Sequence, residues 1–188
     1  MMEVIKDPLA VKEFPIDWSD WLAASGATLD SSSWDLPDGI TLDDDALEDH
    51  VAVALLSGGT LGDYYDVVNH IVASDGQEGD FTLRVFIQKA LLTGVKDPDS
   101  AEDFRIDWSD ELADKTIAQE LEDDTITASE WTAGGGLSSG GDSFESPETT
   151  IRLSGGAAAG AYAEAVNSIT TSRGQTLVAR LHLLSREE

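Results

Sequence analysis

Along most of the chain, apolar and polar residues alternate with a period of two, the pattern of half-buried β-strands. The alternation is clearest near the end of each half, at Phe81, Leu83, Val85 and Ile87 and again at Leu177, Ala179, Leu181 and Leu183. Earlier aliphatic runs, residues 51–56 and 149–153, each lead into Ser-Gly-Gly, where glycine permits the positive φ of a tight turn. Turn signals at this spacing predict six or seven short strands in each half.

The two halves are copies of one another. Residues 14–20 (FPIDWSD) return almost unchanged as residues 104–110 (FRIDWSD), and Lys-Asp-Pro precedes both, at residues 6–8 and 96–98. A repeat of this length indicates duplicated domains of roughly ninety residues. We therefore expect one domain over residues 1–94 and a second over residues 95–188.

Short strands joined by glycine-rich turns predict an all-β protein made of two tandem immunoglobulin-like antiparallel β-sandwich domains. Four tryptophans that recur in both copies, Trp18 and Trp34 with Trp108 and Trp131, are expected in the two cores. Trp21 has no counterpart, because Glu111 takes its place, so we expect it to be more exposed. The second copy also carries an insertion within residues 114–124, where Ile117 and Leu121 are spaced for a short helical turn.

The net charge of the 188 residues is −26, from 11 basic and 37 acidic side chains, and both halves share it. A surface of this sign repels phosphate backbones, so direct nucleic-acid binding is not expected. The first twenty residues show no signal peptide, and no apolar run is long enough to span a bilayer. We interpret the many acidic side chains mainly as a solvated surface, with divalent-cation binding as the alternative. There is no cysteine to form a disulfide or a thiolate metal site.

The alternative places Ca²⁺ at an acidic segment expected to form a loop, with Asp43, Asp44, Asp45, Glu48 and Asp49 as weak candidate ligands. Their spacing does not match an EF-hand. The three histidines fall in no metal-binding spacing, so no transition metal or other cofactor is expected.

No catalytic constellation stands out. Asp17 and Asp107 recur beside a tryptophan, but an acid at a strand end typically accepts backbone N–H bonds in a turn, the role we expect for both. The serines before the double glycines lack a nucleophile elbow, and no glycine run has the lysine of a phosphate-binding loop. The sequence predicts a protein that is not an enzyme.

Motifs in the second copy resemble a family of small tailed-bacteriophage virion proteins. They lie at residues 96–98 (KDP), 106–112, 124–131, 153–156 (LSGG) and 162–175, and the first copy follows them with more divergence. Family members are described as virion structural or fibre-to-tail adaptor proteins with a single β-sandwich domain. In this chain the domain is doubled.

The resemblance implies a non-enzymatic virion protein, assembled in the host cytoplasm, that docks at the neck or tail through one domain and presents the other to fibre or tail proteins. Several copies per particle are expected, with virion proteins as partners and no nucleic acid or membrane. Trp21 and Leu61 are weak candidates for partner contact. Two alternatives stay open: a capsid decoration protein on the head, and a secreted or surface adhesion module with Ca²⁺-binding acidic segments.

Overall fold

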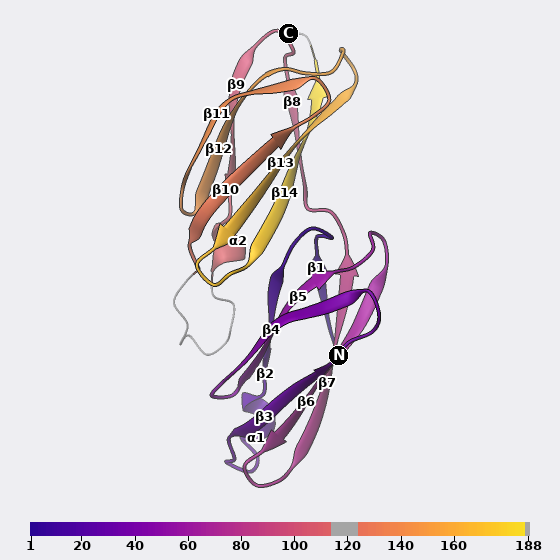
Figure 1. Ribbon diagram of the computed structural model, residues 1–188, viewed down its shortest axis with the longest axis vertical. Helices are drawn as coiled ribbons and strands as arrows, with labels where there is room; N and C mark the ends of the chain where they lie inside the picture. The colour runs from indigo at the N-terminus through magenta and orange to yellow at the C-terminus, as the bar shows by residue number, and fades with distance from the viewer. Residues whose placement is uncertain (114–123, 187–188) are drawn as a thin grey trace. The chain divides into compact units, whose positions relative to one another are not determined.

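The computed structural model describes residues 1–113 and 124–186. These residues form two compact units, one over Met1–Gln88 and one over residues 89–113 and 124–186 (Figure 1). The helical turn expected at Ile117 and Leu121 lies outside the described residues. Among the described residues there is no helix of the length and apolarity needed to cross a membrane.

Unit one contains seven strands in two sheets: β1 (Met2–Lys6), β2 (Lys12–Asp17), β3 (Leu29–Asp35), β4 (Ile40–Glu48), β5 (Val51–Gly58), β6 (Tyr64–Ala73) and β7 (Glu78–Ile87). One sheet has the order β1-β7-β6-β3 and the other β2-β5-β4. One helical turn, α1 (Ser19–Leu22), follows β2.

Unit two repeats this plan with β8 (Leu91–Lys96), β9 (Ala101–Asp107), the turn α2 (Ser109–Leu112), β10 (Ile126–Ala133), β11 (Leu137–Glu145), β12 (Glu148–Gly155), β13 (Tyr162–Thr171) and β14 (Thr176–Ser185). Its sheets have the orders β8-β14-β13-β10 and β9-β12-β11. The prediction of two all-β, immunoglobulin-like sandwiches is confirmed, since each unit packs a four-stranded against a three-stranded sheet (Figure 1).

One feature departs from the predicted antiparallel sheets. The first strand of each unit pairs in parallel with the last, β1 with β7 and β8 with β14. Pro8 and Pro98 follow these first strands. Because proline cannot continue the ladder, the chain turns there and its next strand joins the other sheet.

Each sandwich encloses an apolar core between its sheets. Unit one has two clusters, one around Leu56, Val67 and Leu83 and one around Trp18 and Ile71. In unit two the corresponding side chains form a single cluster. Trp18 and Trp108 are buried as predicted, at 5% and 3% exposure. Trp34 and Trp131 are only half-buried and pack against the edge of these clusters.

The loop prediction for the acidic segment is wrong for residues 43–48, and the corresponding segment of unit two is also a strand. Residues 43–48 belong to β4 rather than to a loop, and residues 138–141 belong to β11. Among the described residues, β4 and β11 are edge strands that pair only with β5 and β12 respectively, and beyond Ile40 and Leu137 none of their side chains is buried. A strand without a buried face has no apolar alternation, so its sequence looks like a loop.

The double-glycine turns are confirmed. Gly58 and Gly59 have φ of 81° and 95°, which only glycine adopts readily. A Cβ atom on Gly59 would lie 2.4 Å from Cδ1 of Ile87, so this turn also needs glycine for close approach to β7.

Candidate functional site

The outer face of the larger sheet in unit one carries a row of apolar side chains. Ile5 on β1 lies opposite Phe86 on β7, and Phe86 lies opposite Tyr64 on β6. Val85 and Ile87 are fully buried, so Phe86 between them points away from the core. Ile5 and Tyr64 are 57% and 56% exposed, and the Tyr64 and Phe86 ring centroids are 5.9 Å apart. We call Ile5, Phe86 and Tyr64 the first outer row.

Charged residues lie beside the first outer row. The next cross-strand set is Glu3, Arg84 and Asp66. Arg84 donates two hydrogen bonds to the Asp66 carboxylate, of 2.7 and 2.8 Å, and its guanidinium carbon lies 4.6 Å from the Tyr64 ring centre. The hydrogen bond from Arg84 holds the pKa of Asp66 below its ordinary value and raises the pKa of Arg84. Arg84 therefore stays charged and supports the tyrosine ring from one side.

Unit two has the same arrangement at the same place. Val95 on β8 lies opposite Leu184 on β14, and Leu184 lies opposite Tyr162 on β13. The exposed fractions of Val95 and Tyr162 are 54% and 55%. His182, one cross-strand set away, stacks on the Tyr162 ring with centroids 4.4 Å apart, and Glu164 lies opposite His182. We call Val95, Leu184 and Tyr162 the second outer row.

The two residues predicted for partner contact lie in different surroundings. Leu61 is 52% exposed in the turn before Tyr64, and the N–H of Gly62 in this turn bonds to the carbonyl of Ile87. This bond places the turn at the end of β7, close to the first outer row. Trp21 on α1 is half-buried and meets Trp18 edge to face with centroids 5.8 Å apart, so much of its ring packs on the core. Contact of either residue with a partner remains a prediction.

The candidate calcium ligands lie along β4 and the turn after it. Asp43, Asp44, Asp45, Glu48 and Asp49 are all exposed. Within residues 1–113 and 124–186, no three acidic or histidine side chains converge closely enough to hold a metal ion. An edge strand also differs from the flexible loop that Ca²⁺ usually requires.

The predicted turn role of the repeated acids is confirmed. The Asp17 carboxylate accepts the Ser19 N–H at 2.8 Å, and the Asp107 carboxylate accepts the Ser109 N–H at 2.9 Å. Each therefore satisfies a free donor at the start of a helical turn. In unit two the Ser109 hydroxyl also bonds to Asp107, and these bonds lower the pKa of Asp107.

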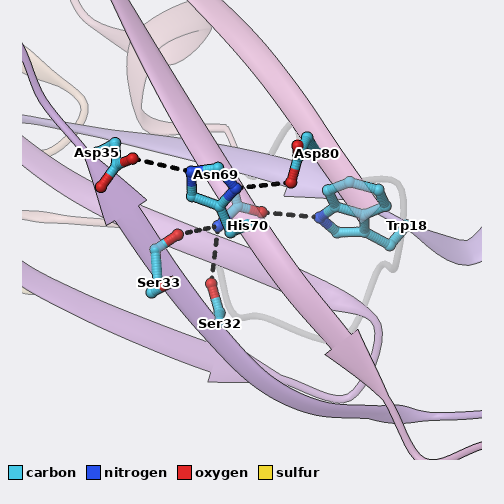
Figure 2. A network of polar contacts seen from close by, with 7 residues as sticks. All are labelled: Trp18, Ser32, Ser33, Asp35, Asn69, His70 and Asp80. Atoms are coloured by element: carbon cyan, nitrogen blue, oxygen red, sulfur yellow. Dashed lines mark hydrogen bonds and ion pairs between the residues drawn. The ribbon is translucent and has the colours of Figure 1, made fainter. Parts of the chain in front are cut away.

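A buried polar network ties the core of unit one to its larger sheet (Figure 2). The indole N–H of Trp18 donates to the side-chain oxygen of Asn69 at 3.0 Å. The Asn69 amide in turn donates to the Ser32 hydroxyl and the Ser33 carbonyl on β3. Asn69 is fully buried, so its polar atoms need these partners. We assign the network to folding rather than to binding.

On the outer side of β6, the strand that carries Asn69, His70 lies between two carboxylates (Figure 2). Its Nδ1 is 2.6 Å from Asp80 on β7, and its Nε2 is 3.0 Å from Asp35 on β3. Hydrogen bonds from the ring to the carboxylates, first that of Asp80 and then that of Asp35, raise the pKa of His70 above its ordinary value. The His70 ring thus bridges three strands, and both of its nitrogens donate when it is protonated.

Each Lys-Asp-Pro motif buries its lysine. Lys6 and Lys96 are 1% and 2% exposed. Their ammonium groups donate to backbone carbonyls, Lys6 to those of Asp7 and Gly58, and Lys96 to those of Asp97 and Ser100. Burial lowers the pKa of Lys6 despite the nearby Asp7 and Asp43. These lysines anchor the turn after the first strand and are not available to a ligand.

The outer rows were not predicted from the sequence, although the sequence contains a pattern that indicates them. Phe86 and Leu184 occupy outward positions of strands whose inward positions are already apolar, and a tyrosine opens each preceding strand at residues 64 and 162. Large apolar residues at outward positions in both copies mark a surface that is not explained by the core.

A family model matches the chain twice, over residues 6–86 and 96–184. It describes the podophage GP4 fiber-tail adaptor protein gp77. The chain belongs to the Gp77 family. Both matches begin at a buried lysine of Lys-Asp-Pro, and together they cover the two repeats. The resemblance to phage adaptor proteins is therefore confirmed, and the family is one of structural adaptors of the phage tail.

No curated protein matches the chain. Among solved structures, it is similar to an endo-fucoidan hydrolase of glycoside hydrolase family 107, with 8% identity and a TM-score of 0.36, over 100% of this chain and 28% of that one. A chimeric titin Z1Z2 is 11% identical with a TM-score of 0.31, covering 100% of this chain and 93% of that one. The Yersinia pseudotuberculosis adhesin InvE is 11% identical with a TM-score of 0.31, covering 97% and 56%. These weak likenesses carry no functional argument for a Gp77 protein.

Proposed function

We propose that this chain is a virion protein that docks on the neck or tail of a podophage through one unit and presents the other unit to a fibre or other tail protein. The observation that carries the proposal is the double match to the fibre-tail adaptor family, one match for each repeat. An adaptor must contact two neighbours, and a doubled domain supplies two surfaces of related shape.

The surface chemistry supports this role. Each unit exposes an outer row with a tyrosine and aliphatic or aromatic neighbours on a sheet face. Aromatic side chains of this kind are enriched at protein interfaces. The proposed role is structural, with several copies per virion and no catalytic step.

The test is immunogold electron microscopy of purified virions with an antibody against the recombinant chain. Label confined to the neck or tail is the expected result. Label over the whole head would instead indicate a decoration protein, and absence of the chain from virions by mass spectrometry would refute a virion role. A virus with an amber stop in this gene is the matched control for antibody specificity.

A further inference from the structure

The two outer rows are equivalent in place and in chemistry. Both lie across the first, last and second-last strands of their unit, and both combine an aliphatic edge residue with an exposed tyrosine. Exposure is matched as well, at 57% and 54% for Ile5 and Val95 and at 56% and 55% for Tyr64 and Tyr162. The residues between them changed from Phe86 to Leu184 while staying apolar.

Neither row serves the core of its unit. The core side chains of these strands point to the opposite face of the sheet, so the side chains of the rows stand in water. Polar side chains at these positions would expose less apolar area at a lower free-energy cost. Each tyrosine is also supported before any partner arrives, Tyr64 by Arg84 and Tyr162 by His182. A ring already held in place loses little freedom on binding, which favours its use as an interface anchor.

Charge indicates what kind of surface fits the rows. Exposed Glu3 and Asp63 border the first outer row beside the Arg84–Asp66 ion pair, and Glu164 borders the second beside His182. The whole chain carries −26. A second copy of the chain would bring the same negative field, so self-association through the rows is opposed. A complementary partner has an apolar centre bordered by lysine or arginine.

We propose that the two outer rows bind two equivalent sites on neighbouring subunits of one homo-oligomeric virion protein, each site an apolar patch with a basic border. This inference rests on the proposed adaptor function and changes one part of it: both units dock through their outer rows, and another face of the chain contacts the fibre or other tail protein. Two matched surfaces in one chain call for two matched sites, and symmetric oligomers are the usual source of repeated identical surfaces. The second contact is then intramolecular, so the chain gains affinity through bivalency.

Site-specific photo-crosslinking in the assembled particle tests the proposal directly. The photoreactive residue p-benzoylphenylalanine replaces Tyr64 in one phage preparation and Tyr162 in another, virions are irradiated, and cross-linked peptides are identified by mass spectrometry. Both positions are expected to cross-link to the same segment of the same polypeptide, a segment containing lysine or arginine. Ser31 and Ala128, exposed at equivalent positions of β3 and β10, are matched control positions and should give no cross-link to it.

Cross-links from residues 64 and 162 to two different proteins, or to none in virions that contain the chain, would overturn the inference and leave the adaptor role intact. Absence of the unmodified chain from virions would instead overturn the adaptor role itself. The two failures are therefore distinguishable.

Binding strength gives a second readout. Particles assembled without the chain are titrated with recombinant full-length protein, either unchanged or carrying Ile5→Ser with Tyr64→Ser, or Val95→Ser with Tyr162→Ser. Loss of either row should weaken binding by on the order of 10²-fold, as expected when bivalent binding becomes monovalent. Changes below about threefold for both variants, with melting transitions like those of the unchanged protein, would contradict bivalent binding; on this scale threefold is under 1 kcal/mol.

Discussion

The two units bury an equivalent tryptophan, Trp18 or Trp108, but satisfy its indole N–H through different side chains. In unit one the Trp18 indole donates directly to Asn69. In unit two the Trp108 indole donates to the Thr149 hydroxyl at 3.2 Å, and this hydroxyl donates to Asn167 at 2.8 Å. Thr149 lies opposite Ile106, the place that Ala52 takes opposite Ile16 in unit one. In unit two the Thr149 side chain, on the facing sheet, thus adds one link between the tryptophan and the asparagine, and these two ends of the network stay the same.

This difference shows which part of the network is constrained. Asn69 and Asn167 both donate to a serine hydroxyl and a backbone carbonyl on the facing strand, β3 or β10. The asparagine and its link to that strand are invariant between the units, whereas the route from the tryptophan varies. In both units the indole N–H of the buried tryptophan, Trp18 or Trp108, finds an acceptor, whereas the buried indole nitrogens of Trp34 and Trp131 have none among the described residues.

The largest expected effect is the loss of these asparagines. Asn69→Ala removes the acceptor of the Trp18 indole and the donor to β3, leaving buried polar groups unpaired, and should destabilise unit one by about 3 kcal/mol. Asn167→Ala should cost about 1 kcal/mol less in unit two, because Thr149 still accepts from Trp108. Hydrogen exchange read separately in each unit measures both values. Equal losses would mean that the Thr149 hydroxyl contributes nothing on its own.

A smaller effect is expected at the last hairpin, where the units also differ. Asp124 is 6% exposed and accepts hydrogen bonds from the backbone of Thr125 and Arg173 and from the side chains of Ser172 and Gln175. In unit one Ala27 stands at this place and the turn is held by Asp75 of the turn itself, which is exposed and bonds to Gln77.

Asp124→Ala should therefore destabilise unit two by about 2 kcal/mol, and Asp75→Ala should change the stability of unit one much less, because Asp75 is exposed. Burial opposes the charge of Asp124, but its hydrogen bonds prevail and lower its pKa below the ordinary 3.8. Its stabilisation is thus present above that value and is lost as the pH falls through the lower folded-state pKa. Chemical denaturation at pH 7 and pH 2 measures the loss of stability caused by each variant. A loss for Asp124→Ala that is as large at pH 2 as at pH 7 would contradict a stabilising role for the ionised carboxylate.

The sequence was most informative where the evidence is local or repeated. Alternation predicted the central strands, and the recurrence of Trp18 and Asp17 as Trp108 and Asp107 indicated both a core position and a turn role. A strand was predicted to begin at Ile40, but its continuation through residues 43–48 of β4 could not be predicted, because these acidic residues bury nothing. The parallel pairing of β1 with β7 depends on residues about eighty positions apart, which no local pattern encodes. The outer rows require knowing which strands are neighbours, so Ile5, Phe86 and Tyr64 looked unrelated in the sequence.

The smallest expected effect concerns His70, which unit two replaces with Ser168 at the corresponding place opposite β14. The pKa of His70 is raised from 6.5 by Asp80 on β7 and Asp35 on β3. A raised pKa in the folded state means that the bridge stabilises unit one fully below about pH 6.5 and that this stabilisation is lost as the pH rises through the higher folded-state value. Because the site is exposed, the effect should be modest and weaker in salt.

The matched variant is His70→Ser, which gives unit one the residue that unit two already has. The difference in melting temperature between the unchanged protein and this variant should be largest at pH 5.5 and should shrink towards pH 9, whereas Ser168→Ala in unit two should show no such trend. Subtracting the variant cancels the pH dependence contributed by every other group, since these groups remain in both proteins. A difference that stays constant from pH 5.5 to pH 9 would show that His70 acts by packing alone, and the three-strand bridge would then have no electrostatic part.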